Sequence, residues 1–201
     1  MELNQRTREI YQRLSERYAA GNVPWDDPVP PPEVLEIATN LPPGRALDLG
    51  CGYGRATIYL AGLGWDVDGV DFIAAAAAEA ALRARTAGVY ARFHIAQVTD
   101  LDFLAGPYDL AIDVGCCHNM AEDDLVRYRD QLERLIRPGG TFLLYARLRE
   151  ATDGEDGPGL RPQMLEGLFA SGFDLERAEF GTTKVPDQPV WRSAWFWFRR
   201  N

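Results

Sequence analysis

The chain has 201 residues, of which 46% are hydrophobic and 25% charged, a composition typical of one globular domain that buries its own core. Its formal net charge of −9 disfavours a nucleic acid as partner, because binding to a phosphate backbone depends on dense lysine and arginine. No run approaches the roughly 20 apolar residues that span a bilayer, so we expect no membrane-embedded segment.

The first 18 residues are charged throughout and lack the apolar core of a signal peptide. Three cysteines in such a chain favour free thiols in a reducing compartment. We therefore expect a cytoplasmic protein, a monomer or a homodimer, and the acidic balance suits a small molecule as its partner.

The N-terminal part is predicted to be helical and separate from the strands that follow. Apolar positions near helical spacing predict a helix over residues 2–20. Residues 21–32 are rich in proline and can form neither a helix nor a central strand. A short helix over about 33–40 completes this segment, which we expect to act as a lid.

From residue 45 onward, apolar strand candidates alternate with helix candidates. The strand candidates are 45–50, 65–71, 90–96, 108–114, 140–147, 173–180 and 191–198. The helix candidates are 55–64, 73–87, 121–137, which ends at the sequence RPGG, and 161–170. This alternation indicates βαβ units, and hence one α/β domain over 1–201 with a doubly wound, mostly parallel seven-stranded sheet and helices on both faces. Residues 1–40 form its lid segment and 41–201 its core.

A glycine-rich turn, LDLGCGYGR, follows the first predicted strand. Gly50, Gly52 and Gly54 allow a tight turn and a close approach of the backbone to a ligand. The fingerprint of dinucleotide-binding proteins, G-x-G-x-x-G, places its third glycine where this chain has Arg55. The spacing therefore disfavours a nicotinamide-dependent oxidoreductase.

Two carboxylates accompany this turn. Asp48 lies two residues before the first glycine, where it would repel a pyrophosphate and attract an ammonium group. Asp71 ends the second strand, where its two oxygens can accept both hydroxyls of a ribose. A ribose and an amino-acid head group without phosphate describe S-adenosylmethionine.

The stretch ALDLGCGYGRATIYLAGLGWDVDGVDF resembles the first two motifs of class I S-adenosylmethionine-dependent methyltransferases. The stretches GNVPWDD, DVGCCHN, RPGGTFLL and SAWFWFRR resemble parts of small bacterial enzymes related to thiopurine, halide and tellurite-resistance methyltransferases. The resemblance implies a Rossmann-like fold. It also implies methyl transfer to an oxygen, nitrogen, sulfur or halide nucleophile of a small molecule, by in-line displacement. A protein of this fold that binds the cofactor without transferring methyl is the alternative.

The resemblance also implies the cofactor contacts. Asp48 and the three glycines would hold the methionine end, Asp71 the ribose, and Phe72 the adenine face. The other residues expected at the cofactor are Trp25, Arg55, Gln97, Val98 and Asp113. The family usually has an aspartate before an apolar residue after the third strand, where this chain has Gln97. Either Gln97 or Asp100 would then meet the adenine edge, and Trp25 would belong to a flap over the cofactor.

The stretch DVGCCHNM, after the fourth strand, has several interpretations. A zinc or multi-thiol site lacks further ligands at suitable spacing, so we expect no metal. A purely structural strand end and a loop facing the acceptor both remain. In the second case His118 would be the general base and Asn119 would orient the acceptor. The residues expected at the acceptor are Tyr18, Cys117, Asn119, Tyr145 and Arg147.

Two further features have competing interpretations. His94 lies on a predicted strand, where a structural, hydrogen-bonded histidine is the expected role. The polar segment 149–159 is either a solvated connection or a loop that covers the acceptor.

Overall fold

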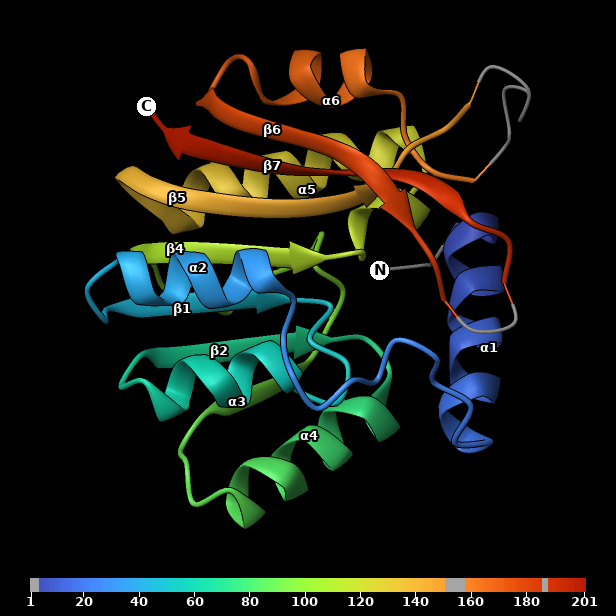
Figure 1. Cartoon of the computed structure of the whole chain (residues 1–201), viewed down its shortest axis with the longest axis vertical. Helices are drawn as coiled ribbons and strands as arrows, with labels where there is room; N and C mark the ends of the chain where they lie inside the picture. The colour runs from blue at the N-terminus through green and yellow to red at the C-terminus, as the bar shows by residue number, and fades with distance from the viewer. Residues whose placement is uncertain (1–3, 151–157, 186–187) are drawn as a thin grey trace.

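A seven-stranded sheet with the order β3-β2-β1-β4-β5-β7-β6 forms the centre of the protein, in a computed structural model that describes residues 4–150, 158–185 and 188–201 (Figure 1). The strands are β1 (Arg45–Leu49), β2 (Asp66–Asp71), β3 (Arg92–Ile95), β4 (Tyr108–Val114), β5 (Ile136–Arg147), β6 (Phe173–Thr183) and β7 (Trp191–Arg200). Strands β1 to β5 pair in parallel, and β7 pairs antiparallel with both β5 and β6. The predicted mostly parallel α/β sheet is confirmed.

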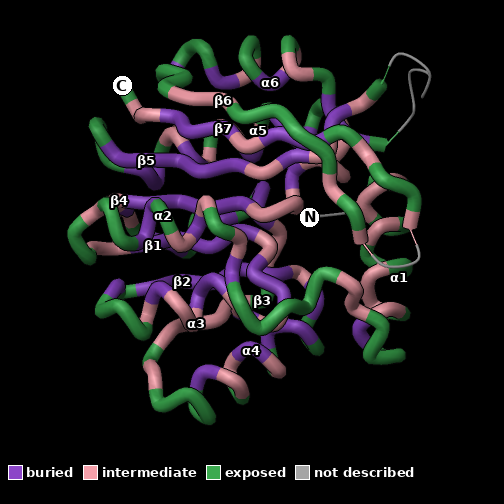
Figure 2. Tube along the Cα trace, viewed as in Figure 1, coloured by how far each residue is buried: buried purple, intermediate pink, exposed green. Residues whose placement is uncertain are grey.

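Helices cover both faces of this sheet. They are α1 (Gln5–Ala19), α2 (Pro32–Asn40), α3 (Arg55–Gly62), α4 (Ala74–Thr86), the short 3-10 helix η1 (Cys117–Asn119), α5 (Glu122–Leu135) and α6 (Pro162–Phe169). Val34 of α2 and Leu60 of α3 belong to one buried cluster, whereas Tyr128 of α5 and Phe169 of α6 pack with Phe142 in the other. The central strands are therefore buried on both sides, as Figure 2 shows.

The amphipathic pattern of α5 explains its position. Leu125, Tyr128, Leu132 and Leu135 recur at helical spacing and are all buried. Three acidic residues occupy the first turn, where they interact favourably with the positive end of the helix dipole. The helix thereby presents one apolar stripe to the sheet and a charged face to solvent.

The boundary between α5 and β5 differs from the prediction. The helix ends at Leu135 and β5 begins at Ile136, so the RPGG sequence lies inside the strand and not at the end of a helix. Ile136 pairs with Tyr108 and Thr141 with Leu110, so the longer run on β5 bulges outward between these two pairs. Pro138, which has no N–H to donate, lies in that bulge, so the ladder continues on either side of it.

The site of a ligand follows from the strand order. The chain proceeds from β1 to β2 and β3 on one side and then crosses to β4 on the other, which makes the carboxyl ends of β1 and β4 the switch point of the sheet. In Figure 1 α1 lies beyond the carboxyl ends of the parallel strands. The N-terminal helix therefore lies across the position where α/β proteins bind ligands.

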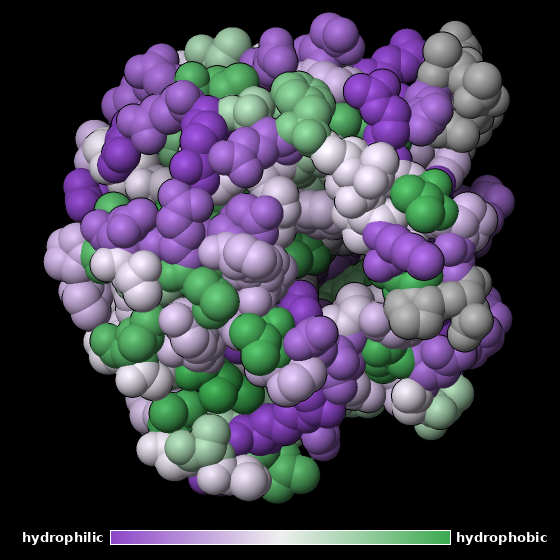
Figure 3. Space-filling model, viewed as in Figure 1, coloured by the Kyte–Doolittle hydropathy of each residue, from purple (hydrophilic) through white to green (hydrophobic). Residues whose placement is uncertain are grey.

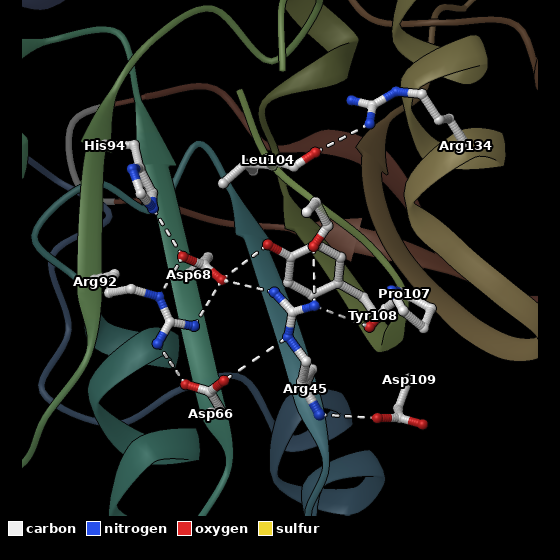
Figure 4. A network of polar contacts seen from close by, with 11 residues as sticks. Arg45, Asp66, Asp68, Arg92, His94, Leu104, Pro107, Tyr108, Asp109 and Arg134 are labelled. Carbon is white, nitrogen blue, oxygen red and sulfur yellow. Dashed lines mark hydrogen bonds and ion pairs between the residues drawn. The ribbon is translucent and has the colours of Figure 1, made fainter. Parts of the chain in front are cut away.

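A network of polar groups around the buried Asp68 connects β1, β2, β3 and β4 (Figure 4). Asp68 accepts hydrogen bonds from Arg92 at 2.7 and 2.8 Å and from the Tyr108 hydroxyl at 2.8 Å. The Nε2 atom of His94 lies 2.8 Å from Asp68, which confirms the structural role expected for this histidine. Arg45 adds a charge contact to Asp68 at 3.6 Å. One carboxylate thus links four neighbouring strands, in the sheet order β3, β2, β1 and β4.

No helix within the described ranges is long and apolar enough to cross a membrane. Among the same residues, no group of three or more histidine, cysteine, aspartate or glutamate side chains could hold a metal ion. Residues 151–157, most of the segment predicted as a solvated or acceptor-covering loop, lie outside the described residues.

Candidate active site

A cavity of about 380 Å³ opens at the carboxyl ends of β1, β2 and β4, beneath α1. This volume is within the range of about 300–1,000 Å³ that small-molecule sites have. The space-filling view in Figure 3 shows a hollow in the face of the protein that it draws. The walls come from the glycine turn after β1, the end of β2, the loop after β4, and α1 with the segment that follows it. The cavity therefore joins the two sequence motifs to the N-terminal helix.

The glycine turn approaches the loop after β4 closely. Gly50 has φ of 70°, and a Cβ atom there would lie 2.6 Å from the Cβ of Cys116. Any other residue at position 50 would therefore be strained and would displace the opposite loop. The N–H groups of Gly50 and Cys51 both donate to the carbonyl of Val70, which fixes the turn against β2.

Asp48 is buried at the floor of the cavity, 3% exposed. One carboxylate oxygen accepts hydrogen bonds from the N–H and hydroxyl of Thr57, at 3.1 and 2.5 Å. Burial raises the pKa of Asp48 to about 6, against the lowering effect of these two bonds, and the nearby charge of Asp113 adds to the increase. No cation among the described residues forms an ion pair with this carboxylate, so the floor of the cavity favours a positively charged group.

Asp71 lies at the end of β2 and is 6% exposed. Its two oxygens each accept one backbone hydrogen bond, from Gly52 at 2.9 Å and from Ile73 at 2.8 Å. Burial raises the pKa of Asp71, and the two bonds oppose that increase. A carboxylate oxygen has two acceptor positions, so each oxygen can still accept one hydroxyl from a ligand in the cavity.

An apolar and amide-bearing wall lies beside Asp71. Phe72 lines the cavity and packs edge-on against Tyr11 of α1, with ring centroids 5.4 Å apart. Gln97 and Val98 line the same wall, whereas Asp100 is exposed and outside it. Of the two residues that sequence leaves open for the adenine edge, the geometry favours Gln97.

The loop after β4 is held by a buried carboxylate. Asp113 accepts hydrogen bonds from the N–H groups of Cys116 and Cys117, at 2.6 and 3.0 Å, and from the Tyr128 hydroxyl at 2.7 Å. The turn directs Cys117 into the core, where it is 0% exposed, and places Cys116 on the cavity wall. His118 and Asn119 follow on the same wall.

His118 is neutral in this environment. Burial, together with the positive charges of Arg147 and Arg13, lowers the pKa of His118 to about 4. Its Nδ1 atom accepts a hydrogen bond from the backbone N–H of Arg147 at 3.3 Å, so the ring proton is assigned to Nε2. A ring in this state donates from Nε2, which favours a hydrogen-bond donor over the general base that the sequence predicts.

The N-terminal segment is tied to the core beside the cavity. Asp26 forms a two-pronged ion pair with Arg83 of α4, at 2.8 and 2.9 Å. Trp25 lies on the cavity wall and directs its indole N–H toward the Tyr18 hydroxyl at 3.4 Å. Tyr18 lies beside Gly52, and thus at the glycine end of the cavity rather than beside η1.

The chain is similar in sequence to known proteins. Residues 46–140 match the methyltransferase domain family. An uncharacterized methyltransferase of Synechocystis is 35% identical over 110 residues, which cover 55% of this chain and 50% of that protein. The chain therefore spans about half the length of this relative.

Solved structures extend the similarity over the full fold. A structure described for the conversion of a disulfide bond into a thioacetal group during echinomycin biosynthesis has a TM-score of 0.80 and 25% identity, covering 95% of this chain and 93% of that one. Residues 46–140 therefore form a methyltransferase domain, and the chain as a whole resembles the class I S-adenosylmethionine-dependent methyltransferases. The Burkholderia thailandensis 1,6-didemethyltoxoflavin-N1-methyltransferase, determined with S-adenosylhomocysteine, aligns with this chain at a TM-score of 0.75 and 22% identity, over 100% of this chain and 92% of that one.

The cavity fits S-adenosylmethionine, the cofactor of the methyltransferases that the chain resembles. The unpaired carboxylate of Asp48 suits the ammonium group, and the free acceptor positions of Asp71 suit the ribose hydroxyls. Gln97 offers an amide to the adenine edge, and Phe72 offers a ring to its face.

Four of the predicted contact residues lie outside the cavity wall that the described residues form: Gly54, Asp113, Cys117 and Tyr145. Gly54 caps α3 and packs against α4, where a Cβ atom would lie 3.0 Å from that of Ala80. Tyr145 donates its hydroxyl to Thr183 at 2.7 Å inside the sheet. Asp113 is the buried carboxylate that holds the loop after β4, and Cys117 is buried in the core.

The remaining predicted residues line the cavity: Tyr18, Trp25, Asp48, Gly50, Gly52, Arg55, Asp71, Phe72, Gln97, Val98, His118, Asn119 and Arg147. Sequence reasoning missed Cys116, Met120 and the residues of α1 that face inward, including Ile10 and Arg13. The spacing of Ile10 and Leu14 already indicated one face of a helix. What that face covers is not encoded in its spacing.

The raised pKa of Asp48 predicts a pH dependence of cofactor binding. The cofactor ammonium favours the ionised carboxylate, whose pKa is about 6 in the free protein. The dissociation constant for S-adenosylhomocysteine should therefore be level above pH 7 and rise by up to about tenfold for each pH unit below 6. Isothermal titration calorimetry between pH 5 and 8 tests this. Asp48→Asn should weaken binding at pH 7.5 and flatten the profile, and an equally steep profile in Asp48→Asn would contradict the assignment.

Proposed function

We propose that this methyltransferase transfers the methyl group of S-adenosylmethionine to a small-molecule acceptor. The observation that carries the proposal is that one cavity contains both a cofactor-suited end, with Asp48 and Asp71, and a second end with His118 and Asn119. The net charge of −9 supports a small acceptor over a nucleic acid. We also place the enzyme in the cytoplasm, since its cysteines are free thiols.

The chemistry requires alignment above all. S-adenosylmethionine supplies a methyl group activated by a sulfonium, which an acceptor nucleophile displaces in line. Asp48 fixes the methionine end of the cofactor and Asp71 its ribose, and Asn119 with the Nε2–H of His118 orients the acceptor opposite the methyl group. Alignment of this kind can supply several kcal/mol of the barrier reduction.

Helix α1 and the segment after it act as the lid in this proposal. Arg6 donates to the carbonyl of Asn119 at 3.0 Å, and Asp26 pairs with Arg83 on the opposite side. These contacts span the cavity mouth between α4 and η1, so closure excludes water from the methyl group.

The test is incubation of the purified chain with methyl-labelled S-adenosylmethionine and a panel of thiols, phenols, amines and halides, read by mass spectrometry. We expect labelled product from at least one class and none from Asp71→Ala at the same cofactor concentration. If S-adenosylhomocysteine binds but no acceptor is methylated, the alternative of a ligand-binding protein without transfer is favoured instead.

The state of His118 gives a separate prediction. Because the pKa of His118 is about 4, the ring is neutral from pH 5.5 upward, and kcat should show no ascending limb between pH 6 and 7 that belongs to this residue. His118→Ala should lower kcat by about tenfold or more, as loss of one oriented hydrogen bond would, with the affinity for S-adenosylhomocysteine unchanged. His118→Gln, which keeps a donor, should recover part of the rate. A limb near pH 6.5 that disappears in His118→Ala would restore the general base.

A further inference from the structure

The acceptor end of the cavity continues into an adjoining hollow between α1 and η1. Arg13, His118 and Asn119 line both spaces, and Arg6 and Glu9 line the hollow. The route from solvent to the acceptor end therefore passes between α1 and η1.

Two arginines at this end carry no carboxylate partner among the described residues. Arg147, at the end of β5, lies over the Trp191 ring at 5.3 Å, and its Nε atom is buried without a hydrogen-bond partner. Within the described ranges, the polar contact of Arg13 of α1 is with an amide oxygen, that of Asn119 at 3.5 Å. By contrast, Arg83 and Arg92 each form two-pronged ion pairs with aspartates.

The acidic groups that the structure describes nearby do not form ion pairs with these arginines. Asp124 lines the cavity but accepts hydrogen bonds from Asn4 at 2.6 Å and Thr7 at 3.1 Å. It also lies 3.7 Å from Arg127. Glu9 accepts from Gln5 at 3.0 Å. Among the residues that the structure describes, a protein with thirty acidic and twenty-one basic residues thus keeps two arginines without a carboxylate partner where its acceptor would bind.

We propose that the methyl acceptor carries a carboxylate, held by Arg147 and Arg13, with its nucleophilic atom directed toward His118. This inference rests on the proposed function and names the class of its acceptor. Guanidinium groups bind carboxylates through paired, charge-assisted hydrogen bonds, which their planar geometry favours. Ile10, Leu14 and Met120 supply an apolar wall for the remainder of the molecule.

The carboxylate of the acceptor binds the two arginines, and a different atom of the acceptor receives the methyl group; we call this bound carboxylate the carboxylate handle. The nucleophile forms a bond to the methyl carbon while the carbon–sulfur bond breaks, and the sulfur keeps the electron pair as S-adenosylhomocysteine forms. A thiolate or amine can attack in this way without a base, and an amine loses its extra proton to water afterwards. This agrees with a neutral His118 that takes up no proton and whose Nε2–H can donate a hydrogen bond to a further lone pair of a thiolate.

Matched acids and amides test the inference by binding as well as by turnover. Mercaptobenzoate, hydroxybenzoate and aminobenzoate are each compared with the corresponding benzamide, by calorimetry or ligand-observed NMR on protein saturated with S-adenosylhomocysteine. We expect the acids of at least one pair to bind about tenfold more tightly than the amides. Arg147→Gln or Arg13→Gln should reduce that preference to about twofold or less, with cofactor affinity unchanged. Arg85→Gln, an exposed arginine outside the cavity, is the matched control.

The outcomes separate this inference from the proposed function. Equal binding of acids and amides, or an equal loss of both in Arg147→Gln, would overturn the carboxylate handle even if methyl transfer is observed. An Arg147-dependent preference for acids without any methylated product would support the handle and refute the transfer. Use of two independent arginine variants guards against a fold defect in either one, which melting temperatures would detect.

Discussion

Asp71→Ala should weaken the binding of S-adenosylhomocysteine by about 100-fold, since two hydrogen bonds to an ionised carboxylate are each worth about 1.5 kcal/mol or more. The substitution removes the acceptor positions for both ribose hydroxyls and releases the N–H groups of Gly52 and Ile73. Isothermal titration calorimetry gives the dissociation constant directly. The affinity of Asp71→Asn, which keeps the shape and one acceptor oxygen, should lie between those of the unchanged protein and Asp71→Ala.

Asp100→Ala is the matched control for this prediction, because Asp100 is an exposed aspartate on the following loop and outside the cavity. Its affinity for S-adenosylhomocysteine should equal that of the unchanged protein. Far-ultraviolet circular dichroism should show the same helix content in all variants. Unaltered affinity in Asp71→Ala would remove the ribose from this position and with it the orientation of the cofactor in the cavity.

Asp68→Asn should lower the free energy of unfolding by about 3 kcal/mol, because it leaves the guanidinium of Arg92 partly buried without its main counter-charge. The same change weakens the contacts of His94 and the Tyr108 hydroxyl to this position. Urea unfolding followed by tryptophan fluorescence measures the difference. Activity at 25 °C should survive, since the network in Figure 4 does not line the cavity.

The contrast with Asp66 makes this prediction specific. Asp66 also pairs with Arg92, but its side chain is half exposed, so Asp66→Asn should cost about 1 kcal/mol or less. Burial raises the pKa of Asp68, but hydrogen bonds from Arg92, His94 and Tyr108 outweigh burial and lower it to about 2. The stabilisation is therefore complete above about pH 4 and is lost as the pH falls toward 2. An equal decrease in the free energy of unfolding for Asp68→Asn and Asp66→Asn would show that burial of the carboxylate does not increase its contribution to stability.

The cofactor end of the site could be predicted from the sequence because its residues lie in one short segment and at the end of the neighbouring strand. Asp48, Gly50 and Gly52 follow one another at the end of β1, and Asp71 ends the neighbouring strand. Parallel strands bring their carboxyl ends to one edge, so the order of residues along the chain already specifies their proximity.

The acceptor end could not be predicted to the same degree. Alternation along an extended strand does not continue past Val114, because the chain turns into the 3-10 helix η1 and places Cys116, not Cys117, on the cavity wall. Tyr145 and Arg147 lie on one strand, yet only Arg147, at its end, reaches the cavity. The contribution of Arg13 depends on where α1 docks, which is a tertiary contact and not a local pattern.

The three hydrogen bonds on Asp113 have a consequence for how acceptor preference can change. They fix the backbone of the loop after β4 through Cys116, Cys117 and Tyr128, none of which supplies the polar groups at the acceptor. The side chains of His118 and Asn119 can then be exchanged while the loop retains its path. This arrangement makes positions 118 and 119 suitable for a randomised library, in which selectivity can diverge without a loss of the folded framework.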